Sequence, residues 1–201
     1  DKNILEDINL DIYQGDFLLI TGPNGGGKTS LLRTILRLQS PTKGRISFFR
    51  QGEPVSSLDM GYLPQKNSID SRFPITVEEV VASGLMGNTQ KGNTKFDSKK
   101  EIDEMLDLMG ITALRNKPIG VLSGGQLQRS LFGRALISKP EMLILDEPAS
   151  YIDRQFGNRM FEILRDLSSN GTTIMMVSHE IEPFITLSNR NLYINHILGD
   201  R

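Results

Sequence analysis

A glycine-rich stretch near the beginning of the sequence places the strongest constraint on the fold. It fits the pattern G-x-x-x-x-G-K-[ST], and its residues are Gly22, Pro23, Asn24, Gly25, Gly26, Gly27, Lys28, Thr29 and Ser30. The apolar run at 17–20 predicts a buried strand before the stretch, and apolar residues at helical spacing predict a helix from Lys28 to about Leu38. A strand, a glycine loop and a helix in this order are the setting that a phosphate-binding loop requires.

The residue types in this loop suit a bound phosphate chain. Glycines let successive backbone N–H groups surround phosphate oxygens, and the start of the following helix adds unpaired donors and partial positive charge. Lys28 can reach the β- and γ-phosphates, and the hydroxyl of Thr29 can coordinate Mg²⁺. A glycine-rich turn that matches by chance is the alternative, but the flanking strand and helix disfavour it. We therefore expect this loop to bind a nucleotide.

Length and composition limit the other possibilities. A chain of 201 residues is long enough for one domain, or for one core that carries an inserted subdomain. It has no cysteine, which excludes disulfides, zinc sites built on thiolates and a cysteine nucleophile. The formal net charge of −1 does not favour a general binder of nucleic acid or other polyanions. No apolar run approaches the roughly 18 residues of a membrane-spanning helix, and we expect no signal peptide.

Apolar periodicity predicts strands that alternate with helices along most of the chain. Residues Ile4–Ile12 alternate loosely, which predicts an antiparallel strand that ends in a turn at Gln14–Asp16. Further strands are expected at 45–49, 60–63, 142–145, 172–177 and 192–194, with a polar loop at 50–57. Asp153 is expected to cap a helix that ends at Asn170-Gly171. This order predicts an α/β fold with a mostly parallel sheet, whose ligands lie at the carboxyl ends of the strands.

The segment between residues 67 and 131 has a different, mainly helical pattern. Thr76 begins a capping box before a short apolar helix, and Ser98 begins a second box before a helix that Gly110 ends. The polar residues between these helices, 87–95, are expected to lack regular structure. We therefore predict a single domain, residues 1–201, with two parts. An α/β core is formed by 1–66 and 132–201, and a helical subdomain by 67–131.

Two adjacent carboxylates, Asp146 and Glu147, follow the apolar run at 142–145. A carboxylate at the tip of a buried strand can hold Mg²⁺ beside a phosphate loop. Two neighbouring carboxylates can also have different roles, one as a metal ligand and the other as the base that accepts a proton from a water molecule. A strand that ends in Asp-Glu is a weak signal by itself. Together with the phosphate loop it indicates a nucleotide site.

A third feature begins directly after Leu122. Ser123 and Gln126 form a capping box before a helix, with Gly124 and Gly125 in its first turn. A capped helix alone would explain the box, but glycines inside a helix each cost about 1 kcal/mol relative to alanine. Glycine at these positions would let the phosphates of another molecule approach the bare amide groups and the Ser123 hydroxyl.

Together, these features resemble the ATP-binding subunit of ABC transporters, and the resemblance covers nearly the whole chain. The matching motifs are Walker A (Gly22–Ser30), the Q-loop residue Gln65, the signature Leu122–Gln126, Walker B (Leu143–Pro148), the D-loop residue Asp153 and the switch histidine His179. Walker A combined with Leu-Ser-Gly-Gly-Gln is highly specific for the family. The resemblance implies an ATPase with a RecA-like P-loop NTPase core, an antiparallel β edge and an inserted helical subdomain.

The resemblance also implies roles for the residues of the hydrolytic site. Thr29 and Gln65, with Asp146 directly or through water, would hold Mg²⁺. Glu147 would polarise the attacking water, and His179 would contact the γ-phosphate. Glu147, His179 and Gln65 would therefore be the catalytic residues.

The family works as a dimer, and the resemblance implies the same for this chain. Two copies would sandwich two ATP molecules head to tail, with Asp153 in contact with the second copy. The signature residues would close on the ATP held by the partner copy, and they are Ser123, Gly124, Gly125 and Gln126. A monomer should therefore bind ATP but hydrolyse it poorly.

Other stretches resemble the bacterial importers of zinc, manganese or chelated iron. These stretches are Tyr62–Gln65, Ser68–Asp70, Phe73–Val81 and Leu122–Arg129. This implies a subunit on the inner face of the cell membrane that powers metal import, partnered by an integral permease and indirectly by a substrate-binding protein. A groove for a cytoplasmic permease helix is expected near 73–86. The alternatives are an importer of another substrate, a non-transport ABC ATPase of translation or DNA repair, and a regulatory module without turnover.

Overall fold

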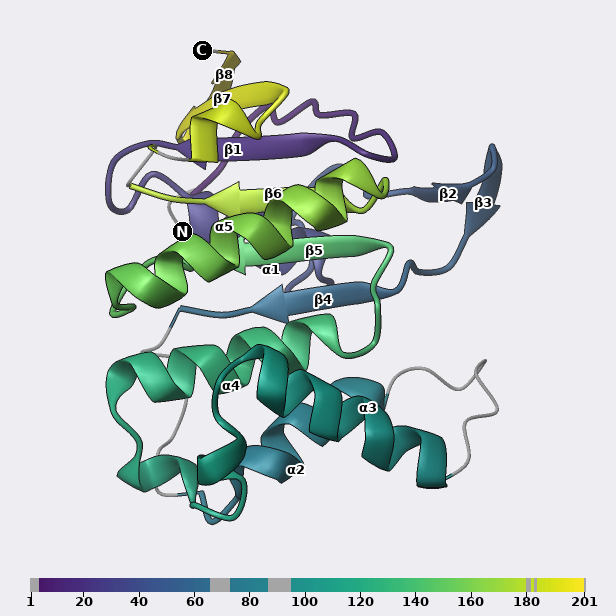
Figure 1. Ribbon diagram of the computed structural model, residues 1–201. Coiled ribbons are helices and arrows are strands. Elements are labelled where there is room, and N and C mark those ends of the chain that lie inside the picture. The colour runs from purple at the N-terminus through teal and green to yellow at the C-terminus, as the bar shows by residue number, and fades with distance from the viewer. Residues whose placement is uncertain (1–3, 66–72, 87–94, 180–181, 183, 201) are drawn as a thin grey trace.

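A six-stranded sheet forms the centre of the computed structural model, which describes residues 4–65, 73–86, 95–179, 182 and 184–200 (Figure 1). The strand order is β4-β5-β6-β1-β7-β8, and only the pairing of β7 with β8 is antiparallel. The strands of this sheet are β1 (Phe17–Thr21), β4 (Met60–Leu63), β5 (Met142–Asp146), β6 (Thr173–Val177), β7 (Arg190–Asn195) and β8 (Ile197–Asp200). A separate hairpin pairs β2 (Phe48–Arg50) with β3 (Glu53–Val55). The predicted α/β fold with a mostly parallel sheet and an antiparallel edge is confirmed.

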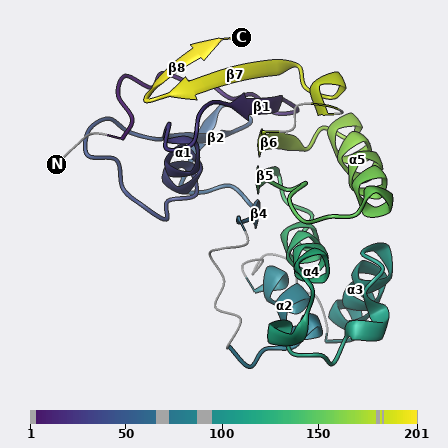
Figure 2. The same cartoon turned by 90° about the vertical axis from the view of Figure 1, so that its left-hand side faces the viewer.

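Helices cover both faces of the sheet, which explains why its central strands are continuous apolar runs. Helix α1 (Lys28–Ile35) lies on one face and α5 (Arg154–Ser169) on the other (Figure 2). Side chains of β1 alternate between these two layers. Leu18 packs in the cluster that contains the apolar face of α1, and Leu19 packs in the cluster that contains the apolar face of α5. All five residues of β1 are therefore buried.

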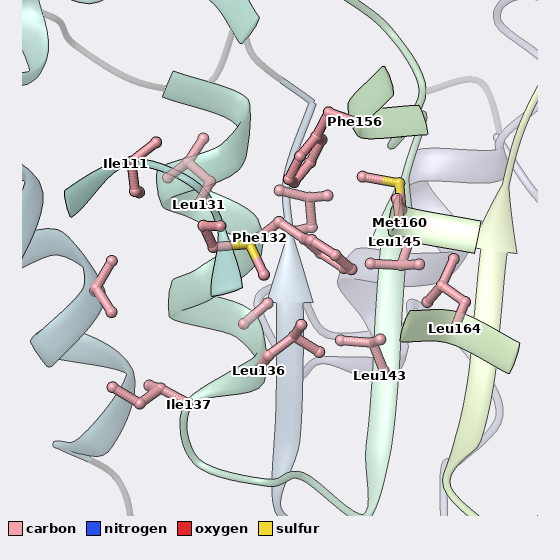
Figure 3. Close-up of a cluster of buried hydrophobic side chains, with 14 of the residues drawn as sticks. Ile111, Leu131, Phe132, Leu136, Ile137, Leu143, Leu145, Phe156, Met160 and Leu164 are labelled. Carbon is pink, nitrogen blue, oxygen red and sulfur yellow. The ribbon is translucent and has the colours of Figure 1, made fainter. Parts of the chain in front are cut away.

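A helical layer lies beyond β4, at the edge of the sheet (Figures 1 and 2). Its α-helices are α2 (Val77–Ala82), α3 (Lys95–Leu108) and α4 (Gly124–Leu136), and its short 3₁₀ turns are η2 (Ser83–Leu85), η3 (Thr112–Leu114) and η4 (Ile119–Val121). A further 3₁₀ turn, η5 (Phe184–Thr186), precedes β7. Helix α4 joins this layer to α5, which covers one face of the sheet, because Phe132 packs edge to face on Phe156 of α5 at 6.5 Å (Figure 3). The predicted boundary between residues 131 and 132 falls inside α4.

The strand predicted at Ile4–Ile12 is wrong. These residues form no strand in the structure, although the turn at Gln14-Gly15 is present. Asp7 has a φ of 51°, which interrupts an extended chain. Ile8 and its apolar neighbours still pack against the core, so their periodicity reflects burial and not strand pairing. The antiparallel edge comes instead from β8, a strand that was not predicted from the sequence.

Two other local predictions are also wrong. The loop predicted at 50–57 contains strand β3 and the hairpin turn that joins it to β2, at Gln51 and Gly52 with φ of 53° and 84°. Helix α3 begins at Lys95, so Ser98 lies inside it and does not cap its start. The capping boxes at Thr76 and Ser123 are confirmed. The polar stretch 87–94 and the motif residues Ser68–Asp70 lie outside the described residues.

No helix in the described part of the chain has the length and apolar character needed to cross a bilayer.

Candidate functional site: a phosphate loop beside two carboxylates

The loop between β1 and α1 is packed too closely against the rest of the chain for larger residues. A Cβ on Gly22 would lie 2.0 Å from the carbonyl oxygen of Ile194 in β7, and the φ of Gly22 is 146°. A Cβ on Gly27 would lie 2.4 Å from the side chain of Leu5, at a φ of 98°. Glycine is therefore required at both positions, because a Cβ would collide with neighbouring atoms and because the backbone has a positive φ. This packing holds the loop at the carboxyl end of β1.

Lys28 begins α1 and turns back over the loop. Its ammonium group donates to the carbonyl oxygens of Gly22 and Pro23, both at 2.9 Å, and only 6% of the residue is exposed. Burial lowers the pKa of Lys28, while the carboxylates of Glu147 and Asp146 act in the opposite direction. A buried cation within a ring of glycines, close to a helix start, is suited to a polyphosphate anion.

Thr29 and Asp146 meet at the same end of the sheet. The hydroxyl of Thr29 donates to a carboxylate oxygen of Asp146 at 3.0 Å, and Asp146 is 1% exposed. Burial raises the pKa of Asp146, and the hydrogen bond from Thr29 opposes this. Hydroxyl and carboxylate oxygens are the ligands that Mg²⁺ prefers. No cluster of three His, Cys, Asp or Glu side chains suited to a metal occurs among the described residues, so phosphate or water oxygens would complete the coordination.

Glu147 is held between two other predicted site residues. Its carboxylate oxygens lie 3.1 Å from Nε2 of His179 and 3.4 Å from Nε2 of Gln65. Glu147 follows β5 directly, with a φ of 52° that strains a residue carrying a Cβ. Its backbone N–H donates to Val177 at 2.9 Å, which ties it to the end of β6. The structure thus brings together the three side chains predicted to be catalytic, whose roles remain predictions.

The signature residues lie in the helical layer, at the start of α4. Ser123 is the N-cap of this helix. Its hydroxyl accepts from the backbone N–H of Gln126 at 3.3 Å, and the amide oxygen of Gln126 accepts from the backbone N–H of Ser123 at 3.0 Å. Gly124 and Gly125 form the first turn, as predicted from the sequence. Figure 2 shows α1 against the sheet and α4 beyond β4, so the two motifs lie on different layers of the chain.

Asp153 caps α5 through its side chain. One carboxylate oxygen accepts from the backbone N–H of Phe156 at 2.9 Å, and the other pairs with Arg129 of α4. The hydrogen bond from Phe156 lowers the pKa of Asp153, and Arg129 adds to this. Arg129 and its neighbour Gln128 had no role predicted from the sequence. Both contact the segment that follows Glu147.

Replacing Asp146 with asparagine is expected to stabilise the nucleotide-free protein at pH 7 by about 1 kcal/mol, because a buried ionised group is replaced by a neutral one. The raised pKa of Asp146 means that ionisation costs more in the folded than in the unfolded chain. This cost is present above the raised pKa and disappears as the pH falls below the ordinary value of 3.8. Urea unfolding of both proteins at several pH values should show a difference that shrinks toward acid.

The matched control for this experiment is Glu141→Gln. Glu141 precedes β5, and its hydrogen bonds with Arg50, at 2.8 and 2.6 Å, lower the pKa of the carboxyl group. Its ionised form therefore contributes stability above the ordinary pKa, and this is lost as the pH falls. Glu141→Gln should destabilise the protein at pH 7. A loss of stability in Asp146→Asn would contradict the electrostatic argument.

Comparison with known proteins gives a consistent result. The model of the family described as "ABC transporter" matches residues 5–150. A "probable metal transport system ATP-binding protein" of Chlamydia pneumoniae is 40% identical over 98% of this chain and 81% of its own length. The zinc import ATP-binding protein ZnuC of Haemophilus influenzae is 35% identical over 96% of this chain and 67% of its own length. Among solved structures, the dimeric ATP-binding cassette MJ0796 bound to ADP and Pi has a TM-score of 0.83 at 25% identity, covering 98% of this chain and 90% of that one.

Proposed function

Because the chain belongs to the ABC transporter family, we propose that it is the ATP-hydrolysing subunit of an importer for a divalent metal ion or metal chelate. The observation that carries the catalytic part is the position of Glu147 between Gln65 and His179, beside Lys28 and Asp146. The names of the similar zinc and metal transport proteins support the choice of cargo. The metal would be handled by partner proteins, since it is cargo and not a cofactor of this chain.

In this proposal ATP and Mg²⁺ bind at the carboxyl end of β1. Backbone N–H groups of 22–30, where Pro23 has none to offer, would surround the phosphates, and Lys28 would turn from the loop carbonyls to the β- and γ-phosphates. The oxygens of Thr29 and Asp146, 3.0 Å apart, and the side-chain oxygen of Gln65 would hold Mg²⁺. The metal would neutralise the charge that develops on the phosphates. Glu147 would accept a proton from the attacking water, and His179 would hold the γ-phosphate.

The signature residues would act on the ATP of a second copy. Ser123 caps α4, and Gly124 and Gly125 form its first turn. The amide groups at the start of this helix would donate to a phosphate of the partner's ATP. These residues belong to a different layer from the phosphate loop, which supports their use in a head-to-tail dimer. We also propose the division into a core, 1–66 and 132–201, and a helical part, 67–131, which are joined through the continuous helix α4. The helical part would approach the partner as one unit when ATP binds.

A groove between the sheet and the helical layer is the proposed contact with the permease. It encloses about 340 Å³ and is lined from the end of α1, the start of β4 and η2, including Leu36, Met60 and Gly84. Two large apolar side chains of the segment 73–86 are exposed, Phe73 before α2 at 62% and Met86 after η2 at 82%. A short amphipathic helix of a membrane protein is a suitable occupant.

The proposed function is tested by isolating the full-length chain from its native membrane with its bound partners. We expect a multispanning permease to co-purify, and the complex in vesicles to take up Zn²⁺ or Mn²⁺, free or chelated, only with ATP. Co-purification with ribosomes or DNA would instead indicate a non-transport ABC ATPase. ATP-dependent uptake of an unrelated solute would overturn the choice of metal.

Charge at the exposed apolar positions is expected to uncouple transport from ATP hydrolysis. Phe73→Glu and Met86→Glu together should lower metal uptake about tenfold, since loss of a central apolar contact commonly costs more than 1 kcal/mol of binding. The ATPase rate of the isolated subunit should stay near wild type, because neither residue belongs to the hydrolytic site. Ile197→Glu, at an exposed apolar position on β8, is the control. Unchanged uptake in the double variant would contradict the docking surface.

A further inference from the structure

The segment that follows Glu147 is held by one face of α4. The side-chain amide of Gln128 donates to the carbonyl oxygen of Pro148 at 3.3 Å, and Gln128 is only 1% exposed. One turn earlier on the helix, a Cβ on Gly125 would lie 2.9 Å from the carbonyl oxygen of Tyr151. The start of α4 therefore touches this segment at two carbonyl groups.

The far end of the segment is tied to the same helix. The guanidinium of Arg129 pairs with the carboxylate of Asp153, and its central carbon lies 4.5 Å from the centre of the Phe156 ring. Phe132, one turn further along α4, also packs on Phe156, with its ring edge to face (Figure 3). Residues 148–153 are thus fixed to α4 at both ends.

The near end of the segment is Glu147 itself. Its carbonyl oxygen accepts from the backbone N–H of Ser150 at 3.2 Å, which closes a tight turn after the carboxylate. A φ of 52° at Glu147 is a conformation that costs about 1–3 kcal/mol and persists only where the surroundings hold it. The contacts from α4 are part of those surroundings.

The bonding of Gln128 is unusual for a residue that serves stability alone. Its amide oxygen is buried and has no hydrogen-bond partner in the described structure, while its nitrogen holds Pro148. A buried polar atom without a partner costs roughly 1–3 kcal/mol, so an apolar residue of similar size would be the more stable choice. The side-chain amide of Gln128 is therefore better explained by the hydrogen bond that its nitrogen donates to Pro148 than by a contribution to stability.

We propose that Gln128 is a positioning residue for ATP hydrolysis. With Arg129, it links residues 148–153 to the start of α4, so that the carboxylate of Glu147 is held in place. This inference rests on the proposed ATPase function.

Gln128→Met tests the hydrogen bond between α4 and residues 148–153, because methionine has a similar length but cannot donate to Pro148. We expect kcat to fall at least about tenfold, since a displacement of about 1 Å at a reacting group can cost about 10²-fold. The KM for ATP and the affinity of the nucleotide-binding loop should stay unchanged. Hydrogen–deuterium exchange of peptides covering 147–155, measured without nucleotide, should become faster.

The matched control is Ser130→Ala. Ser130 is also buried on α4 and loses one hydrogen bond, from its hydroxyl to the carbonyl oxygen of Gln126 at 2.9 Å, but this bond lies within the helix. This variant should keep the wild-type kcat and the wild-type exchange at 147–155. Equal effects of both variants, or wild-type kcat and exchange in Gln128→Met, would overturn the proposal.

A second variant covers the case in which Gln128→Met does not fold. Arg129→Lys keeps the positive charge but loses the planar contact with Phe156 and the directed bond to Asp153. It should also lower kcat and speed exchange at 147–155, and a wild-type result would overturn the proposal. If the wild-type protein does not hydrolyse ATP, the proposed function fails, and the exchange comparison still decides whether the tie exists.

Discussion

Replacing Glu147 with glutamine is expected to lower the rate of ATP hydrolysis by about 10²–10⁴-fold, the usual contribution of a general base. Glutamine has the same shape, so contacts at the positions now 3.1 Å from His179 and 3.4 Å from Gln65 are largely kept. An amide, however, cannot accept the proton of the attacking water. The residues proposed to hold Mg²⁺, Thr29 and Asp146, are unchanged, so ATP should stay bound.

The second consequence of Glu147→Gln is a trapped dimer. If two copies enclose two ATP molecules and open after hydrolysis, a variant that binds but does not hydrolyse should accumulate as the closed dimer. Phosphate release gives the rate, and light scattering during size-exclusion chromatography with ATP and Mg²⁺ gives the mass. Glu141→Gln makes the same chemical change at the other end of β5 and should leave the rate near wild type.

Two outcomes would contradict this account of Glu147. Full ATPase activity in Glu147→Gln would remove its assignment as the base. A wild-type rate per subunit that is high and independent of protein concentration, with monomers as the only species, would contradict the need for a second copy. The two results are separate, because the first concerns chemistry within one chain and the second concerns the signature residues of the partner.

The α/β core was predictable from the sequence because its strands are buried on both faces. Strands covered by helices on each side read as continuous apolar runs, and residues 17–20 and 142–145 are of this kind. The helix after Asp153 was equally clear, since its cap, its apolar face and its terminal Asn170-Gly171 agree. Local signals and tertiary packing favour the same structure in these segments.

The edges of the fold were predicted less well, for physical reasons. At Ile4–Ile12, burial of alternate side chains gave the pattern of a strand, but the backbone follows the core without pairing. The hairpin turn at Gln51-Gly52 lacks the Asn or Asp that usually precedes glycine in a two-residue turn. Strand β8 is short and only partly buried, so its apolar pattern is weak.

For the site, the individual residues could be selected from the sequence, but the contacts between them could not be predicted. Lys28, Asp146 and Glu147 stand in recognisable motifs, and the structure adds that they share one end of the sheet. The contact of Gln128 with Pro148 could not be predicted, because its acceptor is a backbone carbonyl that every residue has. When a side chain binds a backbone carbonyl, the residue type at the acceptor position is not restricted, so the contact leaves no pattern in the sequence.

Replacing Lys28 with alanine is expected to weaken ATP binding by roughly 3 kcal/mol, which is more than a hundredfold in Kd. Lys28 is buried, so its interaction with phosphate is screened little by water. In the structure its ammonium group donates hydrogen bonds to the carbonyl oxygens of Gly22 and Pro23. Exchange of these neutral acceptors for phosphate oxygens is strongly favourable, since hydrogen bonds between charged groups are the stronger ones.

Titration of the purified protein with ATP and Mg²⁺ by calorimetry measures the loss of affinity, and Lys43→Ala, at an exposed position in the loop after α1, is the control. Folding should not be impaired, because burial already lowers the pKa of Lys28 and thus disfavours its charge in the folded chain. Lys28→Ala should therefore unfold at the wild-type urea concentration or slightly above it. Unchanged Kd in a folded variant would mean that the loop amides alone hold the phosphates, and the assignment of Lys28 would fail.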